Sequence, residues 1–459
     1  MDWSLAEALK NWRIDAEIHG DANRLQLPGG KVRIDSRLVE EEDVFVALRG
    51  EIHDAHKFVI ENLVTKAGAI IVDRRWWKTL GSKPQVGAFV IVEDTLAALQ
   101  KLAWAYRKHC NPSVAALTGS NGKTTTKEFA ASILETSFKT HKTQGNLNNH
   151  IGLPMTLLDM PKETEIAMLE MGMNHAGEIA ALCEIAEPEI GLITNVAQAH
   201  TQFLGDIHGV RRAKQELFDA VAETGLALIN LDDPNVRQAA KDAGVKEKMT
   251  FSFNEQAYVS GENLTLNKNG CASFNWQGSK IELDVPGLHN AQNALAAIAM
   301  GVACGVANEK IIDGLREAKT VGGRMTRLEI GGRRIFDDTY NANPESMRAA
   351  IDFLSALPGK ENRFVVLGDM RELGETEIED HDAIIEHAAS KGFAEVLIYG
   401  DLMREAMKPG LENVSLFADK SEIAEGLNRK SKPGDTILLK GSRGLKMEEV
   451  IEQFKKSFA

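Results

Sequence analysis

The amino-acid sequence predicts an α/β protein of three domains, with a parallel sheet in the central domain. Three observations support this class. At ~150 residues per domain, the 459 residues correspond to about three domains. Short apolar strands alternate with helical segments along most of the chain, a pattern typical of parallel sheets covered by helices on both faces. A glycine-rich turn also joins a strand to a helix within residues 114–138.

The first domain is expected to be α/β and to occupy residues 1–110. Apolar runs predict strands at residues 43–48, 69–72 and 88–92. After Thr95, apolar residues recur with helical spacing, which predicts a helix facing one core. Asn111-Pro112 ends this helix, because the residue before a proline disfavours the helical region. We therefore place the first domain boundary there.

The second domain is expected at residues 111–320. Its predicted strands are separated by helical patterns and lie at residues 114–117, 166–169, 190–193 and 226–231. From residue 248 to residue 283 short alternating runs replace the helical pattern, which predicts a small antiparallel insertion. Helices resume at His289.

The third domain is expected at residues 321–459, with a Rossmann-like α/β fold. We interpret Gly322-Gly323 as the hinge that precedes it. Its predicted strands lie at residues 334–336, 364–367, 395–399 and 436–439. Helical patterns between these strands predict a second parallel sheet.

Composition excludes several classes of function. Lys and Arg number 53 and Asp and Glu number 66, so the net charge of −13 argues against nonspecific binding to nucleic acid or anionic membranes. The four cysteines form no Cys-x-x-Cys pair, which argues against a disulfide framework and a zinc ribbon. No apolar stretch reaches the ~18 residues of a membrane span, and the N-terminus lacks a signal-peptide core. We expect a cytoplasmic protein without a membrane span.

The most informative segment is Leu117-Thr-Gly-Ser-Asn-Gly-Lys-Thr-Thr-Thr126, between a strand and a helix. In such a turn, backbone N–H groups and a helix N-terminus converge on an anion, Lys123 reaches the outer phosphates and Thr124 can ligate Mg²⁺. The full P-loop pattern has a glycine five positions before Gly122, where this chain has Leu117. The segment predicts a nucleoside triphosphate site.

Three further residues fall where parallel α/β sheets bind ligands. Glu170 ends the strand at 166–169, and the carboxyl ends of parallel strands line the ligand crevice. A carboxylate there can hold Mg²⁺ together with Thr124. His200 follows the next strand, and Lys214 lies in a helical segment beyond it. Spacing alone assigns neither His200 nor Lys214 a role.

The shortened loop at 118–126 resembles the nucleotide signature of the Mur ligase family, the ATP-dependent amide ligases of peptidoglycan precursor synthesis. Within the family, the similarity is closest to members that add D-alanyl-D-alanine to UDP-N-acetylmuramoyl-tripeptide. The segments that carry it are Gly145-Asn-Leu-Asn-Asn-His-Ile-Gly152, Glu170-Met-Gly-Met-Asn-His-Ala-Gly-Glu-Ile179, Asp337-Asp-Thr-Tyr-Asn-Ala-Asn-Pro344 and Val366-Leu-Gly-Asp-Met-Arg-Glu-Leu-Gly374. In the first domain, Ile34-Asp-Ser-Arg37 is similar to the element that receives the UDP portion, although Asp54-Ala-His56 stands where members commonly have Asp-Gly-His.

The resemblance implies a reaction and a separate role for each of the three domains. ATP would phosphorylate the terminal carboxylate of the tripeptide, and the amine of the dipeptide would then attack the acyl phosphate. The first domain would bind the UDP-precursor, the second ATP and Mg²⁺, and the third would close over the nucleotide. We expect a monomer, because three substrates per chain need no partner subunit.

The resemblance also implies the catalytic and nucleotide-binding residues. Thr124 and Glu170 match a first magnesium position, and His200 and Lys214 match a second, where the lysine carries a carbamate derived from CO₂. With Lys123, the residues Glu170, His200 and Lys214 would be catalytic. ATP would contact Thr118, Gly119, Ser120, Asn121, Gly122, Lys123, Thr124 and Thr125 in the loop, Asn290 and Asn293 at the adenine, and Arg324, Asp338 and Asn341 in the third domain.

Seven residues match substrate-binding positions of the family. They are Ser36, Arg37, Asn146, Asn148, Asn149, Asn174 and His175. Without the resemblance, the asparagines would be read as turn-stabilising residues. The sequence leaves open whether the third residue of the tripeptide is lysine or meso-diaminopimelate.

Three rival classes of protein also bind nucleotides. One is another ligase of the same superfamily, adding the third amino acid to a muramyl dipeptide or glutamate to folate. The segments at 145–152 and 337–344 argue against it. A nucleotide switch or motor is a second rival, but the chain has no Asn-Lys-x-Asp motif that would read guanine. A dehydrogenase is a third, but no Gly-x-Gly-x-x-Gly follows any predicted strand.

Overall fold

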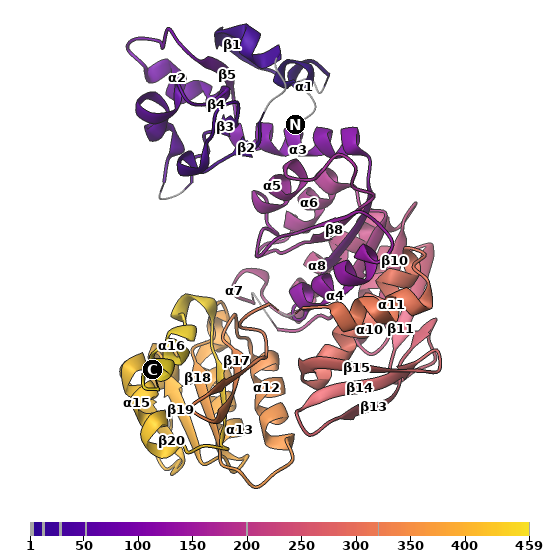
Figure 1. Ribbon diagram of the computed structural model, residues 1–459, viewed down its shortest axis with the longest axis vertical. Helices are drawn as coiled ribbons and strands as arrows, with labels where there is room; N and C mark the ends of the chain where they lie inside the picture. The colour runs from indigo at the N-terminus through magenta and orange to yellow at the C-terminus, as the bar shows by residue number, and fades with distance from the viewer. Residues whose placement is uncertain are drawn as a thin grey trace. The chain divides into compact units, whose positions relative to one another are not determined.

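The computed structural model describes residues 4–11, 14–26, 30–50, 53–198, 201–319 and 321–458. Within these residues the strands form sheets of five, seven, three and six strands, and helices lie between them in the chain (Figure 1). Contacts divide the chain into two compact units. Unit 1 comprises Met1–Ala115, Phe138–Met171 and Ala180–Pro188, and unit 2 comprises Ala116–Ser137, Gly172–Ile179 and Glu189–Ala459.

The five-stranded sheet belongs to unit 1 and has the order β1-β5-β4-β3-β2. Its strands are β1 (Glu17–Gly20), β2 (Val32–Arg33), β3 (Val44–Val46), β4 (Ala69–Asp73) and β5 (Ala88–Val92). β1 is antiparallel to β5 and the other pairs are parallel. Every residue of β4 and β5 is buried, which explains their continuous apolar runs. The sequence predicts a strand over residues 43–48, but β3 spans only Val44–Val46.

The helices of this part are short, except for one. They are α1 (Leu5–Asn11), the 3-10 helices η1 (Ala22–Gln26), η2 (Ser36–Leu38) and η3 (Ala55–Phe58), the π-helix η4 (Val59–Leu63), α2 (Arg74–Thr79) and α3 (Thr95–Cys110). Asp94 caps α3 by accepting from two backbone N–H groups, and Asn111 ends the helix in the left-handed conformation. The predicted helix after Thr95 and its end at Asn111 are therefore confirmed.

The seven-stranded sheet has the order β12-β11-β10-β9-β6-β8-β7. Its strands are β6 (Ser113–Thr118), β7 (Thr140–Lys142), β8 (Ile166–Glu170), β9 (Ile190–Ile193), β10 (Leu226–Asn230), β11 (Glu247–Ser252) and β12 (Val259–Ser260). The pairs from β9 to β12 and the pair β7–β8 are parallel. The helices between these strands, and just after them, are α4 (Lys123–Glu135), α5 (Gly152–Leu158), α6 (Glu178–Ala186), α7 (Thr201–Leu204), α8 (Ile207–Val221), α9 (Pro234–Ala243), α10 (Leu288–Ala303) and α11 (Asn308–Glu317).

The antiparallel insertion begins later than the sequence predicts. β11 covers the first predicted residues of the insertion, but it pairs in parallel with β10. Along β11 the first two residues are exposed, the middle two half-buried and the last two buried, so burial does not follow the alternation of its side chains. The insertion itself is the three-stranded sheet β13 (Glu262–Leu266), β14 (Cys271–Trp276) and β15 (Ser279–Pro286).

The six-stranded sheet has the order β16-β17-β21-β18-β19-β20. Its strands are β16 (Thr326–Ile330), β17 (Arg333–Asp338), β18 (Arg363–Gly368), β19 (Glu395–Tyr399), β20 (Val414–Phe417) and β21 (Thr436–Lys440). β16 and β17 form an antiparallel hairpin, and the other pairs are parallel. The helices are α12 (Pro344–Ala356), α13 (Glu377–Ala389), α14 (Asp401–Ala406), α15 (Lys420–Lys430) and α16 (Glu448–Lys456), with 3-10 turns η5 (Gly374–Thr376) and η6 (Arg443–Leu445).

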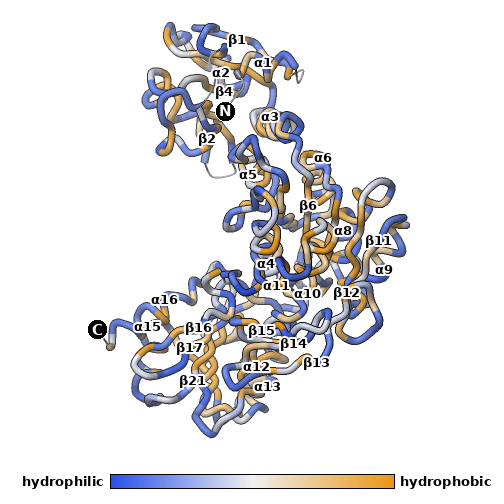
Figure 2. The backbone as a smooth tube through the Cα atoms, turned by 45° about the vertical axis from the view of Figure 1, so that its right-hand side comes forward, coloured by the Kyte–Doolittle hydropathy of each residue, from blue (hydrophilic) through white to orange (hydrophobic). Residues whose placement is uncertain are grey.

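Both faces of this sheet are covered. Along β18, Val365 and Leu367 join a core with α12 and α13, whereas Phe364 and Val366 join a core with α15 and α16. Figure 2 shows the hydrophobic colour on the strands of this sheet, as expected for strands buried on two sides. The three α/β sheets confirm the predicted fold class. None of the helices in the described ranges is long and apolar enough to cross a membrane.

Candidate nucleotide-binding site

The phosphate loop joins β6 to α4 and depends on two glycines. Gly119 has φ +157° and Gly122, which precedes α4, has φ +79°. A Cβ on Gly119 would lie 1.8 Å from Thr194 Oγ1, and a Cβ on Gly122 would lie 2.1 Å from Asn293 Oδ1. No larger residue fits at either position without displacing its neighbour. The tight turn therefore places the N-terminus of α4 directly after the loop.

The segment after β9 holds this loop in place. Ser120 Oγ donates to Ala197 O at 3.0 Å, and Asn121 N donates to Asn195 Oδ1 at 2.9 Å. The carbonyl oxygen of Asn121 accepts from Thr194 Oγ1 at 2.7 Å. Sequence reasoning considered this segment only for His200 and missed its role as a support. His200 itself lies outside the described residues.

Two lysines of unit 2, Lys123 and Lys214, differ in their surroundings. Lys123 Nζ donates to Gly119 O at 2.5 Å and to Ser120 O at 3.3 Å, so its charge stays within the loop. Lys214 on α8 is only 2% exposed. Burial, and then the positive charge of Lys123, hold the pKa of Lys214 well below its usual range. Both effects favour the neutral amine of Lys214 over its charged form.

Glu170 belongs to unit 1 and is buried at the end of β8. Its Oε1 accepts from Asn148 Nδ2 at 2.8 Å, and its backbone N–H donates to Thr143 Oγ1 at 3.0 Å. Its Oε2 is buried and has no hydrogen-bond partner within the described part of the chain. A buried carboxylate oxygen without a partner is costly, and a cation would satisfy it. In the residues that the structure covers, no three His, Cys, Asp or Glu side chains gather as a metal site.

Asn290 and Asn293 lie in α10 and are almost completely buried. Asn293 Nδ2 donates to Asn290 Oδ1 at 2.9 Å, and Thr126 Oγ1 donates to Asn293 Oδ1 at 3.3 Å. Asn290 Nδ2 in turn donates to Pro286 O at 2.7 Å. These side chains support the start of α4, and their contact with adenine stays a prediction.

The expected third-domain residues lie beside β17. Asp338 accepts from Lys440 Nζ at 2.6 Å, and the same Nζ donates to the carbonyl oxygen of Asn341 at 2.9 Å. The guanidinium of Arg324 lies 3.9 Å from the ring centroid of Tyr340, a cation–π contact. Sequence reasoning missed Lys440, although its position at the carboxyl end of β21 is the same signal that selected Glu170.

The expected substrate residues of the first domain, Ser36 and Arg37, lie in the 3-10 helix η2. Arg37 is exposed and pairs with Asp35 at 2.6 Å, and this hydrogen bond lowers the pKa of Asp35 to about 2. Ser36 begins η2. His56 is buried, lies 2.7 Å from Asp54 through Nδ1, and accepts from the backbone N–H of Asp73 at 3.0 Å. His56, the histidine of the segment Asp54-Ala-His56, therefore links η3 to the end of β4 by a hydrogen bond.

The remaining expected substrate residues are polar and mostly exposed. Asn146 is exposed, and Asn149 Oδ1 accepts from two backbone N–H groups at the start of α5, a turn-stabilising role. In unit 2, the exposed His175 lies 3.1 Å from Glu178 Oε1, and Asn174 N donates to Glu178 Oε2 at 2.7 Å. Their contacts with a substrate stay predictions.

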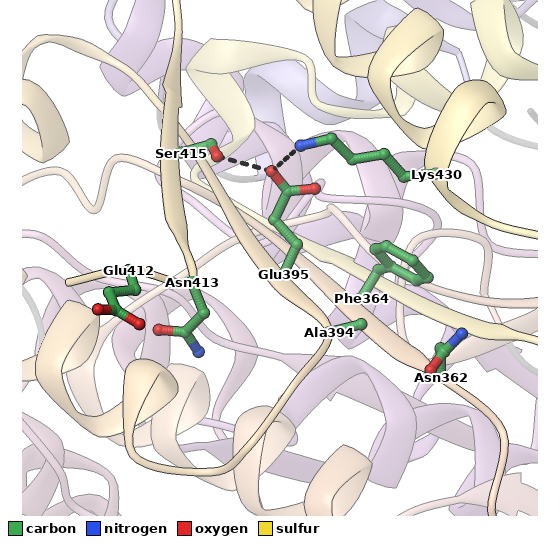
Figure 3. A pocket seen from close by; sticks show the side chains of 8 residues that line it. All are labelled: Asn362, Phe364, Ala394, Glu395, Glu412, Asn413, Ser415 and Lys430. Atoms are coloured by element: carbon green, nitrogen blue, oxygen red, sulfur yellow. Dashed lines mark hydrogen bonds and ion pairs between the residues drawn. The ribbon is translucent and has the colours of Figure 1, made fainter.

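A separate polar pocket of about 320 Å³ lies in the C-terminal sheet (Figure 3). Glu395 faces Ser415 and Lys430 in it, and all three interact through Glu395 Oε1. The pocket lies at the amino ends of β18 and β19, whereas parallel sheets bind ligands at the carboxyl ends of their strands. We therefore assign it no part in the nucleotide site.

A glycine-rich loop between β6 and α4, with a lysine at the start of that helix, defines a P-loop nucleotide-binding protein of three α/β sheets. Comparison with family models narrows this class. The Mur ligase middle domain matches residues 117–301, and the Mur ligase glutamate ligase domain matches residues 323–443. The chain belongs to the Mur ligase family.

Individual relatives are similar over nearly the whole chain. The UDP-N-acetylmuramoyl-tripeptide–D-alanyl-D-alanine ligase of Bacillus subtilis is 37% identical over 92% of this chain and 92% of its own length. A crystal structure of MurF from Acinetobacter baumannii covers 99% of both chains at 31% identity, with a TM-score of 0.87. MurF from Thermotoga maritima in complex with ADP covers 93% of this chain and 97% of its own at 31% identity, with a TM-score of 0.83.

Proposed function

We propose that this chain is an ATP-dependent peptide ligase that joins D-alanyl-D-alanine to UDP-N-acetylmuramoyl-tripeptide. The products are the pentapeptide precursor of peptidoglycan, ADP and phosphate. The observation that carries the proposal is the similarity to ligases of this activity over 92% of both chains. The similarity includes the N-terminal sheet, which the matched middle and glutamate ligase domains do not contain.

The phosphate loop supplies the chemistry that amide formation requires. A carboxylate is a poor electrophile, so its oxygen must first become a better leaving group. The γ-phosphoryl group of ATP is transferred to this oxygen, and the amine of the dipeptide then attacks the carbonyl carbon and releases phosphate. Lys123 turns from the carbonyl oxygens of Gly119 and Ser120 to the phosphates, where its charge stabilises the transferring group.

We further propose that the chain holds two Mg²⁺ ions, one at Thr124 and Glu170 and one at His200 and a carbamate on Lys214. Bound Mg²⁺ would supply charge neutralisation at the phosphoryl group. The unpartnered Oε2 of Glu170 supports the first position. The lowered pKa of Lys214 supports the second, because only a neutral amine attacks CO₂. A C–N bond forms, nitrogen releases a proton to water, and the product is an anionic oxygen ligand suited to Mg²⁺.

The remaining assignments concern the whole chain. We place UDP-precursor binding in residues 1–110, ATP and metal binding in residues 111–320, and closure over the nucleotide in residues 321–459. We place the protein in the cytoplasm, where ATP and nucleotide-linked precursors are available, and expect it to act as a monomer.

Phosphate release tests the proposed function. Purified protein is assayed with Mg²⁺-ATP, D-alanyl-D-alanine and UDP-N-acetylmuramoyl-tripeptide, and each component is omitted in turn. Tripeptides ending in lysine and in meso-diaminopimelate are both used. Phosphate release that depends on both peptides supports the ligase. Release from ATP alone at the full rate would instead favour a nucleotide switch or motor.

The variant Glu170→Gln tests the first metal position. It keeps an acceptor for Asn148 but loses the negative charge, so we expect the Mg²⁺ concentration at half-maximal activity to rise about 10- to 100-fold. The measurement is phosphate release over a Mg²⁺ titration. Glu163→Gln changes an exposed glutamate of the same unit and should leave the titration unchanged. Identical titrations for Glu170→Gln and the unaltered protein would remove Glu170 from the metal site.

A further inference from the structure

The tip of the phosphate loop contacts the C-terminal sheet through one side chain. Asn121 Oδ1 accepts from Asn343 Nδ2 at 2.7 Å, and Asn121 Nδ2 donates to Glu345 Oε2 at 3.1 Å. Both polar atoms of this amide are therefore used by residues at the start of α12. Asn343 lies 222 positions from Asn121 in the chain and Glu345 lies 224 positions from it, and all three residues belong to unit 2.

The orientation of the Asn343 amide is fixed by its role in α12. Its Oδ1 accepts from Ser346 N at 2.9 Å, while Ser346 Oγ accepts from Asn343 N at 3.0 Å, which is a capping box. Pro344 at the first helical position preorganises the same turn. A rotation that exchanged the two amide atoms would break the cap, so the Nδ2 donor must face Asn121.

The backbone of Asn121 is held from the other side by the segment after β9. Its N–H donates to Asn195 Oδ1, and its carbonyl oxygen accepts from Thr194 Oγ1 and from Asn195 Nδ2 at 3.0 Å. Asn121 is therefore fixed between two elements. In a P-loop the peptide groups at this point face the phosphates, so the position of this residue decides how well they fit.

We propose that Asn343 is a positioning residue for the nucleotide: through Asn121 it holds the phosphate loop in its binding conformation. Its effect passes through the side chain of Asn121 and not through a contact of its own with phosphate. The inference rests on the proposed function only for the identity of the nucleotide. It concerns binding of the nucleotide and not transfer of its phosphoryl group. It makes the first turn of α12 part of the nucleotide site.

The test uses Asn343→Ser, since serine still caps a helix but is too short to reach Asn121. ADP binding is measured directly by calorimetry, and the KM values for ATP and for both peptides are measured by phosphate release. We expect the Kd for ADP and the KM for ATP to rise about three- to tenfold, the range that one hydrogen bond contributes. The KM values for the peptides should not change. Asn343→Asp also keeps the cap, but it lacks the donor and adds a negative charge beside the loop, so its loss should be at least as large.

Two further measurements separate positioning from a structural role. Asp419 caps α15 in the same sheet by accepting from Glu422 N, so Asp419→Ser is the matched control and should leave nucleotide binding unchanged. The double variant with Asn121→Ala should bind ADP no more weakly than Asn121→Ala alone. Unchanged ADP binding in folded Asn343→Ser, or additive losses in the double variant, would overturn the inference. Either result leaves the peptide dependence of the unaltered enzyme, and hence the proposed function, untouched.

Discussion

Lys214→Ala is expected to lower kcat for phosphate release about 10³-fold, with all substrates present. The side chain is only 2% exposed, and burial together with Lys123 keeps its pKa low. In the proposed enzyme the amine of Lys214 becomes a carbamate, and alanine provides no anionic oxygen in its place. The loss should therefore appear in the chemical step, while binding of ADP changes little.

Chemical rescue distinguishes a carbamate from other roles of Lys214. Short carboxylates such as acetate fit the space that alanine leaves and offer the missing oxygen, so they should partly restore turnover of Lys214→Ala. Lys214→Arg fills the space, introduces a positive charge and cannot be carbamylated, so acetate should not restore it. Thermal unfolding is recorded for both variants, because Lys214 is buried. Undiminished turnover of Lys214→Ala would exclude the carbamate.

Lys123→Ala is expected to lower kcat by a similar factor of about 10³, corresponding to ~4 kcal/mol of transition-state stabilisation. The ammonium group lies within the loop, 2.5 Å from Gly119 O and 3.3 Å from Ser120 O. The measurement is phosphate release at saturating ATP, together with ADP binding. Lys139→Ala, an exposed lysine beyond α4, is the control and should retain full activity.

The two lysine variants should respond differently to added carboxylate. Acetate replaces an oxygen ligand and not a positive charge, so it should restore Lys214→Ala but not Lys123→Ala. Removing Lys123 also removes a repelling charge, which raises the pKa of Lys214 and makes its amine less available for CO₂. Rescue of Lys123→Ala by acetate would show that the roles of the two lysines are not separate.

Most of the fold and part of the site could be predicted because their signals are local. Strands such as β5 follow from five consecutive apolar residues, and α3 follows from helical spacing closed by Asn111. β11 shows where local signals fail. Its alternation is typical of antiparallel strands, yet the strand is parallel and only its last residues are buried.

By itself, the sequence determined the order of the elements, the phosphate loop at 117–126 and the position of Glu170 at a strand end. These follow from the periodicity and turn chemistry of short segments. Only the tertiary structure decided which residues surround the loop. Asn121 forms hydrogen bonds with Asn195, 74 positions away in the chain, and with Asn343, 222 positions away. Lys440 and Asp338, which are 102 positions apart, also form one. Such pairs depend on how strands are ordered in a sheet, and hydrogen bonds between distant residues leave no periodic pattern in one sequence.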